Sequence, residues 1–159
     1  MPTDFSHLDD TGGISMVDVG AKRSTSREAV ALATVRMTAD TLRKLIDQAL
    51  PKGDVLTTAK IAGVLAAKQT PNLIPLAHPL AISSVDITFD LDPDAGTIEV
   101  RSIVRCEGKT GVEMEAMTAC AVAALTIYDM CKSAEKGISI ESLQLVRKSG
   151  GKSGTWERG

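Results

Sequence analysis

Aromatic, cysteine and histidine residues are scarce in this sequence, and each scarcity narrows what the protein can be. The 159 residues include one Trp, one Tyr and two Phe, so a hydrophobic core must be built from aliphatic side chains. The three cysteines show no CxxC spacing and are odd in number, which favours reduced thiols in the cytosol over a disulfide framework. Two histidines without clustered cysteines argue against a structural zinc site, and we expect no metal ligand.

Long apolar runs and long blocks of a single charge are also missing. The start, MPTDFSHLDDTGG, has no basic segment followed by an apolar one, so no secretory signal is predicted. No apolar run reaches the ~18 residues that a membrane span needs. The net charge is −2 with both signs mixed, and neither a basic block nor an aromatic stacking platform points to nucleic acid. We therefore expect a cytoplasmic protein that binds neither a membrane nor a nucleic acid.

The sequence does contain a regular series of strand and helix patterns. We expect a flexible N-terminal arm over residues 1–13, a single domain over 14–154 and a flexible end over 155–159. Strands are predicted at 14–19, 28–37, 84–92, 97–105 and 138–148, and helices at 39–49, 55–69 and from 113 to about 135. From residue 28 onward this is the β-α-β-β-α-β order of a ferredoxin-like α+β fold, an antiparallel sheet with helices packed on one face and one additional helix.

Residues that begin and end helices flank these segments. Thr38 and Asp54 can cap the first two helices, Pro71 would end the second, and an extended, proline-rich loop is predicted over residues 70–80. Thr110 and Glu113 match a capping box at the start of the third helix.

The end of the third predicted helix carries an acid and a base. The run from Met117 to Tyr128 contains no charge, and Asp129 and Lys132 then follow on one helix face. An aspartate near a helix C-terminus opposes the helix dipole, so this placement needs a compensating partner. If the pair is partly buried, each group can shift the other's pKa towards values useful in catalysis, and a structural ion pair is the alternative.

A glycine-rich stretch near the C-terminus, KSGGKSG over residues 148–154, resembles a phosphate-binding loop only in part. It lacks the earlier glycine and the following helix of a P-loop. Lys148 and Lys152 beside exposed glycine amides could still bind an anion, and a flexible tail is the alternative.

The other candidate side chains each have an ordinary explanation. His78 is held in a rigid loop between two prolines, where it could contact a ligand or simply pack. Glu115 in a first helical turn is favoured by the helix dipole alone. Lys22, Arg27 and Lys52 are ordinary surface bases when each is taken singly.

Seven stretches in order give a more specific signal. They are MVDVGAK, PKGDV, AKIAGVLAAKQT, LIPLAHPL, KTGVEMEAMTA, ALTIYDMCK and KSGGKSG, and they cover about residues 14–154. Together they closely resemble the cyclic pyranopterin monophosphate synthase family of molybdenum cofactor biosynthesis. The resemblance implies a single catalytic domain with a ferredoxin-like fold. It also implies a homohexamer, a trimer of dimers with sites at the dimer interfaces.

The resemblance implies a reaction as well. The family comprises phosphorus–oxygen lyases that convert 3′,8-cyclo-7,8-dihydroguanosine 5′-triphosphate, made by an upstream radical GTP cyclase, into cyclic pyranopterin monophosphate and pyrophosphate. We expect no cofactor, and whether Mg²⁺ is needed stays open. The rival hypotheses are an oligomeric nucleotide-binding module without turnover and a purely structural oligomer. Both of them make Asp129 and Lys132 a stability pair.

Matching the motifs residue by residue carries the family's functional positions onto this chain. The catalytic aspartate falls on Asp129, and the essential lysines fall on Lys52 and Lys132. The expected substrate contacts are Leu76, Ala77, His78, Glu113, Met114, Glu115 and Lys148, to which we add the bases Arg27, Lys22 and Lys152. The family usually has Cys where this chain has Ala77, which excludes a thiol nucleophile at that position.

Overall fold

A single antiparallel sheet of five strands, in the order β2-β3-β1-β4-β5, organises the fold. The computed structural model describes residues 5–50 and 54–159. The strands are β1 (Thr25–Arg36), β2 (Ile82–Asp92), β3 (Thr97–Gly108), β4 (Ser139–Ser149) and β5 (Trp156–Glu157). The helices are α1 (Ala39–Ile46), α2 (Val55–Leu73) and α3 (Glu113–Cys131).

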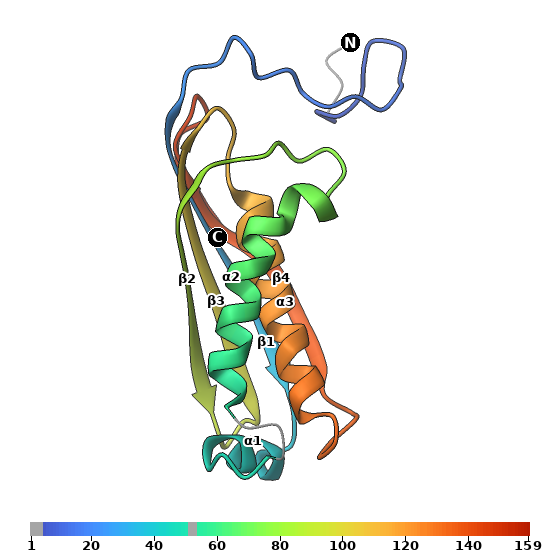
Figure 1. The fold of residues 1–159 in the computed structure, drawn as a ribbon, viewed down its shortest axis with the longest axis vertical. Coiled ribbons are helices and arrows are strands. Elements are labelled where there is room, and N and C mark those ends of the chain that lie inside the picture. The colour runs from blue at the N-terminus through green and yellow to red at the C-terminus, as the bar shows by residue number, and fades with distance from the viewer. Residues whose placement is uncertain (1–4, 51–53) are drawn as a thin grey trace.

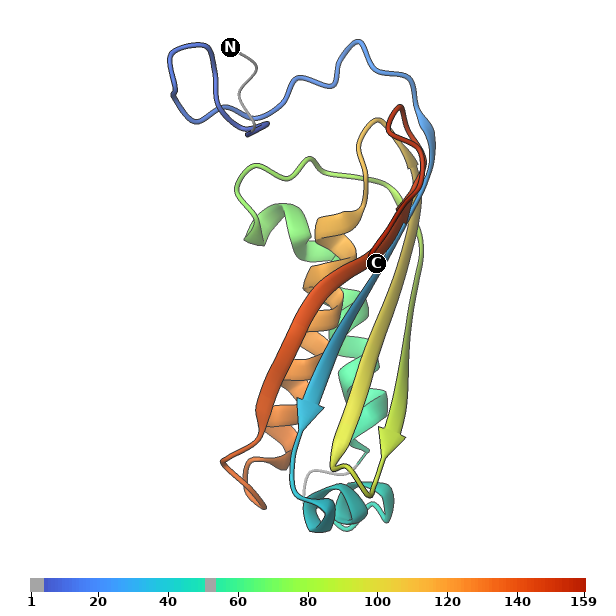
Figure 2. The same cartoon turned by 180° about the vertical axis from the view of Figure 1, so that it is seen from behind.

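The arrangement of these elements confirms the predicted ferredoxin-like α+β fold. The central strand β1 pairs antiparallel with β3 on one side and β4 on the other, and β2 pairs with β3. The helices α2 and α3 cover one face of the sheet, and α1, the additional helix, lies at one end of the molecule (Figure 1). The view from behind shows the strands in front of the helices, so no helix among residues 5–50 and 54–159 covers the other sheet face (Figure 2).

Small side chains let the helices pack closely against the sheet, as the aliphatic composition predicts. α3 lies against β1, β3 and β4, and α2 lies against α3 and β2. The fully buried small residues at these contacts are Ala29, Ala31 and Ala33 of β1, Ala59 and Ala67 of α2, and Ala116, Ala119, Cys120, Ala123 and Ala124 of α3. By length and composition α3 could cross a membrane, but nine of its residues are buried within this fold, as in a core helix.

Side-chain caps start the first two helices, as predicted. The hydroxyl of Thr38 accepts a hydrogen bond from the amide of Thr41 at 3.3 Å, and the carboxylate of Asp54 accepts one from the amide of Thr57 at 3.0 Å. Such caps satisfy amides that have no partner inside the helix. The helices α1 and α3 end at Ile46 and Cys131, earlier than the sequence suggested.

The start of α3 shows that the predicted capping box is wrong. The N-cap residue is Val112, and no side chain caps the helix. The Thr110 hydroxyl instead donates to the carbonyl oxygen of Gly111 at 3.3 Å. Glu113 forms an ion pair with Lys148, with the nitrogen and oxygen 3.0 Å apart. The carboxylate of Glu113 therefore pairs with Lys148 of β4 and does not bind the backbone at the start of the helix.

Pro71 bends α2 and does not end it, contrary to the prediction. The helix continues to Leu73, and its final turn leans away from the rest of the helix axis (Figure 1). Proline lacks an amide hydrogen, so it removes one helical hydrogen bond and kinks the helix. The extended loop predicted from residue 70 therefore begins at Ile74.

The two ends of the chain also differ from the prediction. Residues 14–19 form no strand, and an isolated bridge joins Leu8 to Ile14. The carbonyl of Val17 accepts its hydrogen bond from a side chain instead of a neighbouring strand. Beyond β4, the short strand β5 was not predicted, and it pairs with Arg147 and Lys148.

Candidate active site

The N-terminal segment, residues 5–24, passes beyond one end of the sheet and helices (Figure 1), and it lines part of a pocket of about 1000 Å³. Four parts of the chain line it. They are the N-terminal segment with the start of β1 (Ser6, His7, Val17, Val19, Lys22, Arg23, Thr25, Arg27), the loop after α2 (Leu76, Ala77, His78), the loop and first turn at the start of α3 (Lys109, Thr110, Gly111, Glu113, Met114, Glu115), and the end of β4 with the following loop (Lys148, Gly151, Lys152, Ser153).

Positive charge dominates this pocket, which we call the basic pocket. Glu113 and Glu115 are its two acidic residues, and six lysine or arginine residues line it. These six are Lys22, Arg23, Arg27, Lys109, Lys148 and Lys152. A concave surface lined by one sign of charge concentrates ligands of the opposite sign. The geometry therefore suits an anionic ligand, and a triphosphate is one with enough charge to engage several of these groups.

Two side chains hold the N-terminal segment over the pocket. The Nε2 atom of His78 lies 2.7 Å from the carbonyl oxygen of Val17, and the Nζ atom of Lys109 donates to the carbonyl oxygen of Gly20 at 2.8 Å. A carbonyl oxygen can only accept, so Nε2 of His78 carries the hydrogen. In the neutral ring Nδ1 is then free of a hydrogen and can accept one.

Arg27 is fixed in place by the backbone around it. Its Nε and Nη2 atoms donate to the carbonyl oxygens of Gly108 and Lys109, at 3.3 and 3.2 Å. On the other side, Gly150 and Gly151 have φ angles of 98° and 75° and pass so close that a Cβ atom would collide with Ser26 or Arg27. Only glycine fits both the left-handed backbone and the close approach. The glycine-rich stretch thus packs against a pocket arginine and is more than a tail.

Glu115 places a buried carboxyl group in the pocket wall. The residue is 3% exposed. Burial raises the pKa of its carboxyl above the ordinary value, and the nearby charge of Glu113 adds to this effect. A carboxyl with a raised pKa in a cleft is a candidate proton donor or acceptor.

No cysteine contributes a thiolate to the pocket. Cys106, Cys120 and Cys131 are all free and buried, and the residues that line the pocket do not include them. Burial raises the pKa of Cys120 to about 12 and that of Cys131 to about 11, so both thiols stay protonated and unreactive near neutral pH. At the position where the resembling family usually has cysteine, Ala77 presents a methyl group.

The predicted catalytic pair lies away from this pocket. The Nζ atom of Lys132 is 2.7 Å from Oδ1 of Asp129, and the two side chains are 49% and 57% exposed, so the condition of partial burial is not met in the single chain. The hydrogen bond to Asp129, together with its charge, raises the pKa of Lys132. Asp129 follows Glu115 by fourteen residues on α3, which separates them by about 21 Å along the helix axis. Lys52, the third predicted catalytic residue, lies outside the described residues.

The structure thus sorts the predicted site residues into two groups. All ten predicted substrate contacts line the basic pocket, and Asp129 and Lys132 lie at the far end of α3. The sequence reasoning missed Arg23, Thr25 and Lys109, which also line the pocket. Arg23 directly follows Lys22, Lys109 is the first residue of the motif KTGVEMEAMTA, and Thr25 lies two residues before Arg27, so closeness to the chosen residues was the available signal. Within the described part of the chain, no group of three or more His, Cys, Asp and Glu side chains is placed to hold a metal ion.

The chain is similar to proteins of one known family over nearly its whole length. A model of the MoaC family matches residues 16–151. The chain is 59% identical over 154 residues to the cyclic pyranopterin monophosphate synthase of Geobacter sulfurreducens, covering 97% of this chain and 96% of that protein. It is 56% identical to the protein of the same name from Geobacter metallireducens, with the same coverage. The corresponding protein of Roseiflexus sp. is 55% identical over 152 residues, covering 96% of both chains.

Proposed function

The chain belongs to the MoaC family, and from this premise we propose that the basic pocket is the substrate site of a cyclic pyranopterin monophosphate synthase. The protein is a lyase of molybdenum cofactor biosynthesis. Its substrate is 3′,8-cyclo-7,8-dihydroguanosine 5′-triphosphate, and its products are cyclic pyranopterin monophosphate and pyrophosphate. One observation above all supports the location of the site: ten residues chosen from the sequence, nine of them within separate motifs, line one pocket that has six cationic side chains.

The cationic side chains have a clear role in this reaction. Formation of the cyclic phosphate displaces pyrophosphate, so negative charge accumulates on the leaving group. Lysine and arginine groups already aimed at that charge stabilise it without reorganisation. We assign Lys22, Arg27, Lys148 and Lys152 to the triphosphate end of the substrate.

The remaining polar groups of the pocket suit the proton transfers. Opening and closing rings moves protons at each step, so an acid and a base must be held close to the substrate. Glu115 offers a buried carboxyl with a raised pKa, and His78 offers an Nδ1 atom free of hydrogen in its neutral ring. Leu76, Ala77 and Met114 supply the apolar wall that excludes water from reactive intermediates.

We place Asp129 and Lys132 in the basic pocket of a second chain. A twofold axis near the middle of α3 would set two copies of this helix antiparallel, with Glu115 of one beside Asp129 of the other. The exposed side of the helix layer supports such a contact, because Ile61 and Leu65 of α2 and Leu125 of α3 are 57%, 56% and 56% exposed. Apolar residues at this exposure favour an interface. Dimers of this kind would assemble into the homohexamer that the family resemblance implies.

A turnover assay tests the function directly. The cyclised GTP intermediate is supplied to the purified protein, and released pyrophosphate is measured. Enzyme-dependent release supports the synthase. Tight binding of the intermediate without pyrophosphate release would establish the nucleotide-binding module instead.

The proposal also covers the cellular compartment and the need for a cofactor. We infer that the protein works in the cytoplasm on the product of the radical GTP cyclase, without a bound cofactor. The three free, buried cysteines agree with a reducing compartment. The role of Mg²⁺ is decided by the same assay after exhaustive chelation, since a cation that accompanies the triphosphate would restore turnover when it is added back.

A further inference from the structure

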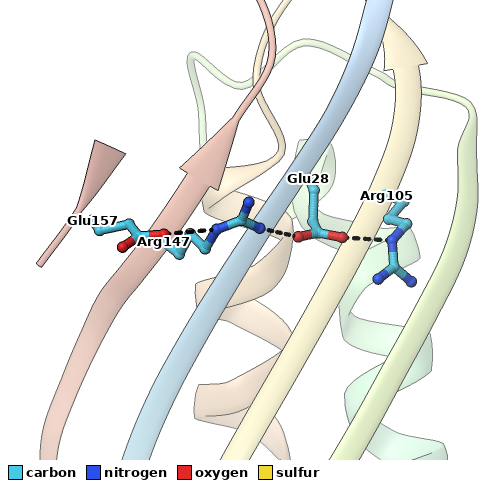
Figure 3. Close-up of polar contacts among 4 residues, drawn as sticks. All are labelled: Glu28, Arg105, Arg147 and Glu157. Carbon is cyan, nitrogen blue, oxygen red and sulfur yellow. Dashed lines mark hydrogen bonds and ion pairs between the residues drawn. The ribbon is translucent and has the colours of Figure 1, made fainter. Parts of the chain in front are cut away.

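A row of alternating charges crosses four strands on the uncovered face of the sheet (Figure 3). Glu28 of β1 lies at its centre. One carboxylate oxygen of Glu28 is 2.6 Å from Nε of Arg105 on β3, and the other is 2.5 Å from Nη1 of Arg147 on β4. Arg147 in turn pairs with Glu157 of β5 at 3.1 Å. The Glu28 side chain is 21% exposed, so it is more shielded from water than a typical surface partner.

This row lies directly behind the cationic wall of the basic pocket. Successive residues of a strand point to opposite sheet faces. Arg27 precedes Glu28 on β1, and Lys148 follows Arg147 on β4, and both of these neighbours line the pocket. The two central members of the charge row are therefore one residue away from two proposed phosphate ligands, on the other side of the same strands.

The pairing of β1 with β4 needs support at this point. Its register shifts twice, between Val30 and Ala31 and between Leu32 and Thr34, and the first shift is the nearer one to the pocket end of the two strands. Arg147 and Lys148 still pair in regular register with Val30 and Ala29, but the irregular pairing beyond them fixes this end of β4 on β1 less firmly than a continuous ladder would. The two ion pairs of Glu28 bridge β3, β1 and β4 at this same end and so hold the strands in one register.

We propose that Glu28 is a positioning residue: its two ion pairs hold β1 and β4 together at the pocket end and so set the spacing of Arg27 and Lys148 relative to the phosphates of the substrate. The inference rests on the proposed function for the identity of the substrate, but its geometry concerns the binding of a polyphosphate alone. Glu28 lies outside the pocket, so it contributes to substrate binding through its neighbours. Loss of its carboxylate would also leave Arg105 and Arg147 without the anion between them.

The sign of the effect separates positioning from simple electrostatics. Removing a negative charge behind a basic pocket makes the pocket more positive, and this alone would strengthen the binding of an anion. Loss of positioning weakens it. The two explanations therefore predict opposite changes for Glu28→Gln, which keeps the size of the side chain and removes its charge.

The experiment compares Glu28→Gln with a matched control on the same two strands. Arg36 of β1 and Glu141 of β4 form a similar cross-strand pair at 3.0 Å, at the end away from the pocket, so Glu141→Gln removes an equivalent charge. The dissociation constant of inorganic tripolyphosphate is measured by calorimetry, and KM and kcat are measured with the cyclised GTP intermediate. For Glu28→Gln we expect KM and this dissociation constant to rise about three- to tenfold with kcat within about twofold, and no change in the control.

Each other outcome contradicts the positioning role. Unchanged or tighter tripolyphosphate binding in Glu28→Gln, or an equal loss in Glu141→Gln, would overturn it. If Glu28→Gln does not fold, Glu28→Asp keeps the charge and shortens the side chain, so weaker tripolyphosphate binding in that variant can come only from lost positioning. Absence of turnover in the unmodified protein would refute the proposed reaction, and the tripolyphosphate comparison would still decide the role of Glu28.

Discussion

At the scale of single residues, the buried carboxyl of Glu115 lowers the stability of the folded protein when it ionises. A carboxyl group that is 3% exposed is difficult to ionise, and burial raises its pKa above the ordinary value of 4.5. The folded protein therefore holds this proton at pH values where the unfolded chain has already released it. Stability is full below the unfolded pKa and declines as the pH rises through the folded one.

The variant Glu115→Gln removes the titrating group, so it should show how far the carboxyl lowers stability and how far it contributes to activity. We expect its Tm to exceed that of the unmodified protein at about pH 8, and the difference to vanish below about pH 4.5. Activity should fall at every pH, because the amide cannot take or give a proton. Thermal unfolding across the pH range, together with the pyrophosphate assay, measures the two effects. A Tm gain that is independent of pH would refute the ionisation argument.

Replacing Lys132, unlike replacing Glu115, should change activity without changing stability. The Lys132 side chain is 49% exposed, and its pair with Asp129 is a surface pair of a kind that contributes little to folding. We expect Lys132→Ala to lose turnover and to keep its Tm within about 2 °C of the unmodified protein.

The matched control for Lys132 is Lys44→Ala. Lys44 is also 49% exposed, and its Nζ atom lies 2.7 Å from Oδ2 of Asp40, within helix α1. This variant should keep both Tm and turnover. Equal activity losses in the two variants would mean that exposed helical ion pairs matter in general here, and that Lys132 has no specific part in the reaction.

The candidate site could be predicted from the sequence at this scale only in part. Motif matching found His78, Glu115 and Lys148, because such motifs report residue identity at fixed spacing. It could not find the charge pair of Glu113 with Lys148, because 35 positions separate the two residues in the sequence. It also assigned Glu113 to a cap, since a local pattern gives no information about a partner on a distant strand.

At the scale of elements, α2 packs very closely against α3 and the sheet at Gly63. A Cβ atom added at Gly63 of α2 would collide with Ile87 of β2 and would lie 2.9 Å from the carbonyl oxygen of Ala119 on α3. Gly63 is therefore needed for close approach, although its backbone is helical. The usual gain from replacing glycine by alanine in a helix should be reversed here.

Gly63→Ala should therefore destabilise the protein, by about 1–3 kcal/mol, through overpacking. Chemical denaturation measures this free energy of unfolding. Lys68→Ala, at an exposed position of the same helix, is the control and should change it by less than about 0.5 kcal/mol. A stabilised Gly63→Ala protein would show that α2 can shift outward without cost, and that the close packing is not required.

Most elements could be predicted because their signals are local and periodic. The alternation in β2 and the caps at Thr38 and Asp54 appear as the sequence indicated. The errors arose where a distant contact decides the local structure. The segment 14–19 has a strand-like pattern but is held by His78 and not by another strand, and β5 depends on its pairing with β4.

At the scale of the whole molecule, one chain does not bring its expected catalytic groups together. The basic pocket lies at one end of the helix layer, and Asp129 and Lys132 lie about 21 Å along α3 from Glu115. No rearrangement of side chains spans that distance within a chain. A pair of chains related by a twofold axis resolves the separation, because each end of one α3 then meets the opposite end of the other.

Mixing two inactive variants tests this sharing of sites. Glu115→Ala and Asp129→Ala proteins are combined under conditions that exchange subunits, and exchange is followed by mass spectrometry. In a mixed dimer one site carries both substitutions and the other carries neither. Random pairing makes about half of the dimers mixed, so about one quarter of the full activity should return.

A second mixture supplies the control, because Asp129 and Lys132 come from the same chain in every site. Combining Asp129→Ala with Lys132→Ala leaves each site of a mixed dimer with one damaged residue, so no activity should return. Recovery in the first mixture and none in the second would establish that Glu115 works with Asp129 and Lys132 of its partner chain. Verified exchange with no recovery in either mixture would place the three residues in separate roles. The 21 Å separation along α3 would then require another explanation, such as Asp129 and Lys132 stabilising the assembly without touching the substrate.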